Sequence, residues 1–104
     1  MKKILVIDDD PAINELIKIN LEAEGHEIIT AHSGPEGIEK AKKEKPDVIT
    51  LDIMMPEMDG FQVLEVLKKV PETKDIPVIL VSVVAGKLPK ERGLRLGAVD
   101  FLPK

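Results

Sequence analysis

Four short apolar runs in this chain each end at a polar or charged residue. The segments between them carry helical spacing, and such runs are typical of strands in a parallel sheet that is buried on both faces. In an open parallel sheet, ligands bind outside the carboxyl ends of the strands. We therefore expect one site to gather the residues that follow the runs, namely Asp8 and Asp9 after 4–7, Asp52 after 48–51, Ser82 after 78–81, and Lys104, which follows the run 101–102 and Pro103.

Helix signals divide the chain between these runs. Asp10 and Pro11 suit a helix start, because Asp can cap free backbone N–H groups and proline is tolerated in the first turn. The apolar residues at helical spacing in this first helix are Ile13, Leu16, Ile17 and Leu21. The expected helices run from Pro11 to the stop at Gly25, from Ser33 to Lys45, over 61–70 and over 88–96, and the expected strands cover 4–7, 26–31, 47–51, 76–81 and 98–102. Right-handed crossovers predict a flavodoxin-like, doubly wound α/β fold with a five-stranded parallel sheet in the order 2-1-3-4-5.

The length of 104 residues allows one domain and is too small for two. A doubly wound sheet needs helices on both faces, yet Lys104 follows the fifth expected strand directly. We expect residues 1–104 to be a single domain that is truncated at its C-terminal side, with the last covering helix missing. If another copy of the chain covers the apolar sheet face instead, the protein self-associates.

The composition argues against several classes of protein. The formal net charge is -4, whereas a sequence-independent nucleic-acid binder carries a basic face. The chain has no cysteine, which excludes disulfides and thiolate sites and fits a reducing compartment. Met1 to Lys3 leads into a short strand, which predicts neither a signal peptide nor a membrane span. We expect a cytoplasmic domain whose partner recognises an acidic pocket rather than nucleic acid or a membrane.

Asp8 and Asp9 form a pair of carboxylates at the end of one expected strand. Such a pair repels unless a cation or protons intervene. Mg²⁺ prefers hard oxygen ligands and commonly takes only one or two protein carboxylates, sharing the rest of its coordination with phosphate and water. The three acids at 8 to 10 can also be read as helix caps, but Asp10 alone is sufficient for that purpose. We therefore predict that Asp8 and Asp9 are Mg²⁺ ligands.

Asp52 ends an apolar strand and precedes a loop that reaches Asp59-Gly60, which we interpret as ordinary turn residues. A carboxylate at the position of Asp52 can attack a phosphoryl group and form an acyl phosphate. Standing alone, it would be better explained as a turn residue. Ser82 can donate a hydrogen bond to a phosphoryl oxygen, and Lys104 can supply a compact positive charge. Each signal is weak by itself, and the shared position at the strand ends gives the set its weight.

The same residues resemble the response-regulator receiver domain, the phosphoacceptor module of two-component signalling. The segments that carry the resemblance are 4–10 (ILVIDDD), 52–60 (DIMMPEMDG), Ser82 and 96–104 (LGAVDFLPK). They are spread over nearly the whole chain, and their combination is highly specific. The resemblance implies that Asp52 takes a phosphoryl group from the phosphohistidine of a histidine kinase or phosphotransfer protein. It also implies a phosphoacceptor that catalyses its own phosphorylation rather than an enzyme with turnover.

The resemblance assigns roles to the surrounding residues as well. The implied Mg²⁺ ligands are Asp8, Asp9, Asp52 and the backbone carbonyl of Met54. Ser82 and Lys104 would bind the phosphoryl oxygens, and Phe101 would be the aromatic whose rotation reports phosphorylation. Phosphorylation adds charge and three acceptor oxygens, so drawing Ser82 toward them would open space into which Phe101 can turn.

Other functions fit parts of the same pattern. A Mg²⁺-dependent aspartyl-phosphate hydrolase uses the same residue types, but Met54 stands where such an enzyme would need a second Asp, and the chain has no cap domain. Sustained turnover of a small phosphomonoester would favour the hydrolase. A receiver-like scaffold that is never phosphorylated is a second alternative. A flavin carrier would share the fold, but the chain has only two aromatic residues to stack on a flavin ring.

Overall fold

The computed structural model describes residues 2–83 and 87–103 of the chain. Within these ranges, strands and helices alternate strictly. The strands are β1 (Lys3–Ile7), β2 (Glu27–Ala31), β3 (Val48–Asp52), β4 (Val78–Ser82) and β5 (Asp100–Pro103). The helices are α1 (Pro11–Ala23), α2 (Gly34–Glu44), α3 (Gly60–Lys69) and α4 (Lys87–Arg95). Each expected element is present, and its ends lie close to the expected ones.

The five strands form a single parallel sheet in the order β2-β1-β3-β4-β5, which confirms the prediction. The chain runs from β1 outward to β2 and then crosses back to β3, so the order reverses between β1 and β3. Ligands bind at such a reversal in doubly wound sheets. Ile7 pairs with Leu51, so the next residues, Asp8 and Asp52, lie at the same level at the carboxyl ends of β1 and β3.

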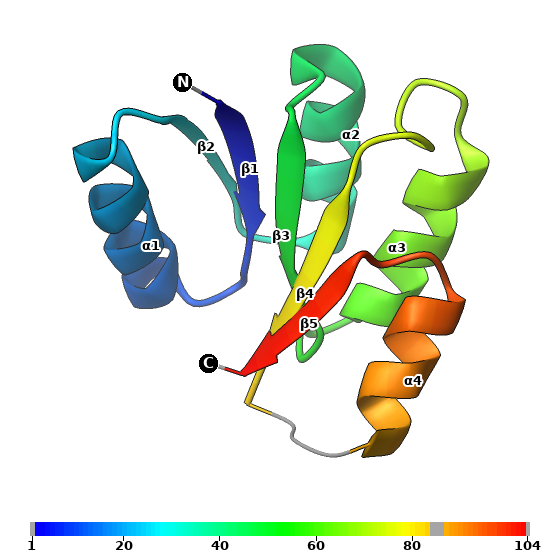
Figure 1. Ribbon diagram of the computed structural model, residues 1–104. Coiled ribbons are helices and arrows are strands. Elements are labelled where there is room, and N and C mark those ends of the chain that lie inside the picture. The colour runs from blue at the N-terminus through cyan, green and yellow to red at the C-terminus, as the bar shows by residue number, and fades with distance from the viewer. Residues whose placement is uncertain (1, 84–86, 104) are drawn as a thin grey trace.

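The larger part of the core lies on the sheet face that carries α2, α3 and α4 (Figure 1). Strand residues alternate between this face and the other one, as β4 shows: Val78 and Leu80 are fully buried, whereas Ile79 and Val81 are only partly buried. The core is aliphatic apart from the two aromatic residues, Phe61 and Phe101. This packing fixes the strand ends against α3 and α4.

The opposite face of the sheet is only partly covered. There, α1 packs over β1 and β2 (Figure 1), on a small cluster that contains Ile4, Val6 and Ile28. Beyond Val48 of β3, which packs against this cluster, no helix among the described residues covers β3, β4 and β5 on this face (Figure 1), so the last covering helix of the prediction is missing from them. The Thr50 hydroxyl on this face is buried without a hydrogen-bond partner in the described part of the chain, and Leu102 is 44% exposed. Self-association through this face stays a prediction.

Side-chain caps define where α1 and α3 begin. The Asp10 carboxylate accepts a hydrogen bond from the backbone N–H of Ala12 at 2.9 Å, which confirms its expected capping role. Asp59 forms a capping box with Gln62, in which each side chain accepts a hydrogen bond from the other's backbone N–H at 2.9 Å. The interpretation of Asp59-Gly60 as a plain turn was therefore wrong, because these residues start α3. Across the described ranges, every helix is too short or too polar to cross a membrane.

Candidate functional site

Three carboxylates converge at the carboxyl ends of β1 and β3. Asp8 and Asp9 directly follow β1, and Asp52 is the last residue of β3. One carboxylate oxygen from each of them lies within 4.8 Å of the other two. Asp8 is 2% exposed and Asp52 3% exposed, and Asp9 is intermediate. Water screens buried charges poorly, so the repulsion among three ionised groups at this distance favours a bound cation.

Backbone N–H groups help to orient two of the carboxylates. The N–H of Asp10 donates to Asp8 Oδ1 at 2.9 Å, just before α1 begins. The N–H of Met54 donates to Asp52 Oδ1 at 3.4 Å, a long hydrogen bond within the loop after β3. Both donors come from the loops that follow the strands. The acidic group is therefore held by the same turns that lead into α1 and α3.

Asn14 supports the site, although no motif in the sequence pointed to it. Its side chain is 2% exposed, and its Nδ2 donates to the backbone carbonyl of Asp8 at 2.6 Å and to that of Ala31 at 3.3 Å. The backbone N–H of Asp8 also donates to the Ala31 carbonyl, at 3.0 Å. Asn14 thereby ties α1 to the ends of β1 and β2. The only sequence signal was an amide next to the apolar stripe of an expected helix.

Ser82 lies on the strand next to Asp52. Val81 of β4 pairs with Asp52 of β3, so Ser82 is one position further along the neighbouring strand. Ser82 is 1% exposed and pairs with Pro103 of β5. The sheet thus brings Ser82 to the same end of the strands as the three acids. Lys104, the expected phosphoryl-binding cation, lies outside the described residues.

Met54 and Phe101 differ in solvent exposure. The Met54 side chain is 58% exposed, whereas its backbone lies beside the Asp52 carboxylate, as the hydrogen bond at 3.4 Å shows. Phe101 is 8% exposed, pairs with Leu80 on β4 and belongs to the main core. The ring is therefore turned inward in this structure. The switching role of Phe101 stays a prediction.

The donor set matches the chemistry of a hard divalent cation. Three carboxylates supply oxygen ligands, and Asp9 is open to water while its two neighbours are buried. Mg²⁺ typically combines a few carboxylates with water and phosphate oxygens. The described residues at this site offer no thiolate or imidazole, which softer metals prefer. The site therefore fits Mg²⁺ better than zinc or copper.

Comparison with known protein families agrees with the sheet order and the acidic group. Residues 4–104 match the model of the family described as "Response regulator receiver domain". The chain belongs to this family. Receiver domains are the phosphoacceptor modules of two-component response regulators and are not enzymes in the usual sense. The sequence resemblance and the fold prediction are both confirmed.

Individual relatives support the same assignment. The receiver is 45% identical over 102 residues to the response regulator PleD of Caulobacter vibrioides, and this match covers 98% of the chain but 22% of PleD. It is 41% identical to the protein PilH of Pseudomonas aeruginosa over 104 residues, which cover 86% of PilH. Several of the curated relatives it matches, including PleD, are thus more than twice as long as the chain.

Solved structures show the same architecture. The receiver superposes on the N-terminal domain of a response regulator receiver protein from Methanoculleus marisnigri with a TM-score of 0.93 and 36% identity, covering 100% of this chain and 85% of that one. For the chemotaxis protein CheY4 of Vibrio cholerae the TM-score is 0.94 at 32% identity, with coverage of 100% and 87%.

Proposed function

We propose that Asp52 accepts a phosphoryl group from the phosphohistidine of a histidine kinase or phosphotransfer protein. The observation that carries this proposal is the convergence of Asp8, Asp9 and Asp52, whose ligand oxygens lie within 4.8 Å of one another. Family membership supports two-component signalling, and the position of Asp52 at the end of β3 supports its choice as the acceptor. The absence of cysteine fits a cytoplasmic location for the reaction.

In the proposed step, a carboxylate oxygen of Asp52 attacks the phosphorus of the phosphohistidine. The new O–P bond forms as the P–N bond breaks, and the electron pair of the P–N bond stays on the imidazole nitrogen. The ring leaves as neutral imidazole when its other nitrogen carries a proton. The product is an acyl phosphate on Asp52. The chain catalyses this transfer by positioning the carboxylate at the carboxyl end of β3, beside Asp8 and Asp9.

Three groups of the site are proposed to stabilise the phosphoryl oxygens. Asp8, Asp9 and Asp52 would hold Mg²⁺ together with the backbone carbonyl of Met54. The bound ion supplies positive charge to the phosphoryl oxygens. Ser82 would donate its hydroxyl proton to one of these oxygens, and Lys104 would pair with another. Ser82 is already buried at the same carboxyl end of the sheet as Asp52.

The proposed signal is a change at the face formed by α4 and β5. Movement of Ser82 toward a phosphoryl oxygen would alter the packing around Phe101, which pairs with Leu80 two residues before Ser82. A partner that contacts α4 and β5 would then distinguish the two states.

Metal binding gives a first test with closely matched variants. Isothermal titration with Mg²⁺ should show that Asp8→Asn and Asp9→Asn weaken binding by about tenfold or more, because each variant removes a charged ligand. Asp10→Asn also removes a neighbouring carboxylate but preserves the helix cap, since Asn caps as well as Asp. Its effect should be clearly smaller. Equal weakening in all three variants would mean that only general negative charge matters.

Phosphotransfer from a P–N bond gives the second test. Phosphoramidate is a small donor of this class, and phosphorus NMR should show a retained acyl phosphate in the presence of Mg²⁺. Asp52→Asn should show none, and Ser82→Ala should react more slowly. Continuous consumption of the donor with many turnovers and no retained acyl phosphate would contradict the proposal and support a hydrolase.

A further inference from the structure

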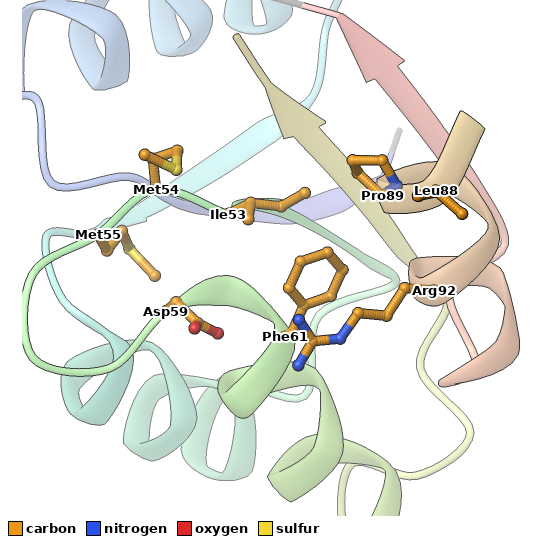
Figure 2. A pocket seen from close by; sticks show the side chains of 8 residues that line it. All are labelled: Ile53, Met54, Met55, Asp59, Phe61, Leu88, Pro89 and Arg92. Carbon is orange, nitrogen blue, oxygen red and sulfur yellow. The ribbon is translucent and has the colours of Figure 1, made fainter. Parts of the chain in front are cut away.

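A second concave surface lies between α4 and the loop that joins β3 to α3. It is a pocket of about 440 Å³, within the range of roughly 300–1,000 Å³ that is typical of ligand pockets. Figure 2 shows its lining, which consists of Ile53, Met54, Met55, Asp59, Phe61, Leu88, Pro89 and Arg92. Most of these side chains are apolar. The pocket is therefore suited to an apolar group from outside the chain.

Arg92 supplies a cation that is fixed at the wall of this pocket. Its guanidinium carbon lies 4.2 Å from the centroid of the Phe61 ring (Figure 2). Stacking on an aromatic face restricts the guanidinium while its N–H groups stay able to bind a carboxylate in a bidentate manner. Arg92 has no ion pair with any residue in the described ranges. It is thus a positioned and available anion-binding group.

The helix that carries Arg92 is basic although the whole protein is acidic. Helix α4 contains four basic residues and only one acidic residue, whereas the whole chain has a formal net charge of -4. The acidic residue, Glu91, lies 3.8 Å from the ammonium group of Lys87 in an exposed ion pair. Beside these charges, Leu88 is 78% exposed and Met54 is 58% exposed. Positive charge and exposed apolar surface therefore adjoin at one place.

We propose that this pocket binds an acidic peptide segment of a partner protein. One bulky apolar side chain of the segment inserts between Ile53, Phe61 and Leu88, and a flanking carboxylate pairs with Arg92. The remaining basic residues of α4 attract the acidic segment over a longer range. Methionine side chains, which adapt to different shapes, suit a surface that accepts an aromatic or an aliphatic anchor.

Asp59 is the acidic residue of the pocket lining and is unfavourable for binding an acidic peptide. Asp59 lines the same pocket, where its negative charge would repel an acidic ligand. It is retained for a structural reason, because it accepts the backbone N–H of Gln62 at 2.9 Å and caps α3. The proposal therefore predicts that Asp59→Asn, which preserves a capping side chain, strengthens the binding of an acidic peptide.

The test uses a short acetylated peptide in which Glu and Asp flank a central Phe-Leu pair. It is titrated into the ¹⁵N-labelled chain without Mg²⁺ or a phosphodonor, so that failure of phosphorylation cannot affect the result. The expected amide shifts cluster at Ile53, Phe61, Leu88 and Arg92. Replacing Phe-Leu by Ala-Ala should weaken binding by about tenfold or more, because the buried apolar anchor is lost. Added salt should also weaken binding.

Matched variants separate the pocket from the surface of α4 in general. Arg92→Gln should weaken binding by about fivefold, whereas Arg95→Gln, on the same helix but outside the pocket lining, should have a smaller effect. Leu88→Ser should abolish the preference for the apolar anchor, and Leu94→Ser should preserve it, since Leu94 does not line the pocket.

Three results would overturn the proposal. The first is the absence of binding at millimolar peptide, and the second is equal losses in the paired variants. The third is a set of pocket shifts that follow protein concentration without peptide, which would identify a second copy of the chain as the occupant.

Discussion

The side-chain amide nitrogen of Asn14 lies 2.6 Å from the backbone carbonyl oxygen of Asp8, so α1 holds the end of β1 by a buried hydrogen bond. The same amide reaches the carbonyl of Ala31 at the end of β2. The loop that carries Asp8 and Asp9 is thereby fixed on the side away from Asp52. A residue that touches none of the reacting atoms is expected to control the geometry of the acidic group.

Replacing Asn14 by alanine should lower both stability and metal affinity. The free energy of unfolding should fall by about 1–3 kcal/mol, because the Asp8 and Ala31 carbonyls each lose the buried hydrogen bond from the Asn14 amide. Mg²⁺ affinity should also fall, by more than the lower stability alone would cause. The reason is that the Asp8–Asp9 turn is held less firmly without the Asn14 side chain. Leu16→Ala on the same helix removes an exposed side chain and should change stability by less than about 0.5 kcal/mol. Urea unfolding and Mg²⁺ calorimetry measure the two effects. Unchanged Mg²⁺ affinity in folded Asn14→Ala would refute the positioning role.

Gly60→Ala should disturb the loop that follows Asp52. A Cβ atom at Gly60 would lie 2.4 Å from the backbone oxygen of Asp52 and 2.7 Å from Ile53 Cα. Backbone atoms cannot move aside as a side-chain tip can, so we expect a loss of about 1–3 kcal/mol despite the better helix propensity of alanine. Glu65→Ala, at an exposed site of α3, is the control. Equal unfolding midpoints for both variants in urea would contradict this account.

The start of α2 should become less stable in acid because of Glu36. The backbone N–H of His32 donates to its carboxylate at 2.7 Å and lowers the pKa of Glu36 below 4.5; burial opposes the shift, and Lys40 adds to it. A lowered folded-state pKa gives stability that is present above the unfolded value and is lost as pH falls through the folded one. Because the group is partly exposed, the contribution is at most about 1 kcal/mol. Glu36→Gln should therefore reduce the dependence of stability on pH below about pH 4.5. Parallel pH curves for the two proteins, from thermal unfolding, would exclude this role.

The partly covered sheet face should promote self-association of the 104-residue chain. Ile79 and Val81 are only partly buried and Leu102 is 44% exposed on the face that α1 leaves open. Burying this apolar surface against a second copy is favourable by the hydrophobic effect. Light scattering should show a mass that rises with concentration, and Leu102→Glu should return it toward the monomer. A monomeric mass at every concentration would contradict the prediction of self-association.

The sequence predicted the fold because local and long-range signals agree. Runs such as Ile4 to Ile7 are both strand-forming and fully apolar, and the helical segments between them force parallel pairing. Once the order 2-1-3-4-5 is assumed, the strand ends bring Asp8, Asp52 and Ser82 together without further information. The acidic group was therefore predictable from residue types and their positions after the strands.

The parts that the sequence did not reveal depend on tertiary packing. Helical spacing selected Leu16, yet α1 covers only β1 and β2, so its inner stripe is narrow and Leu16 is 56% exposed while Asn14 is buried. Likewise, the pocket beside Arg92 arises where α4 approaches the β3–α3 loop. No local sequence pattern predicts the contact between Arg92 and Phe61.

Phosphorylation of Asp52 is the central claim, and intact mass spectrometry tests it most directly. The chain is incubated with Mg²⁺ and acetyl phosphate beside an Asp52→Asn control. We predict a mass increase of a single phosphoryl group that requires Mg²⁺ and is absent from the control. An unmodified mass, or an adduct of equal yield on Asp52→Asn, would contradict the assignment of Asp52 as the phosphoacceptor.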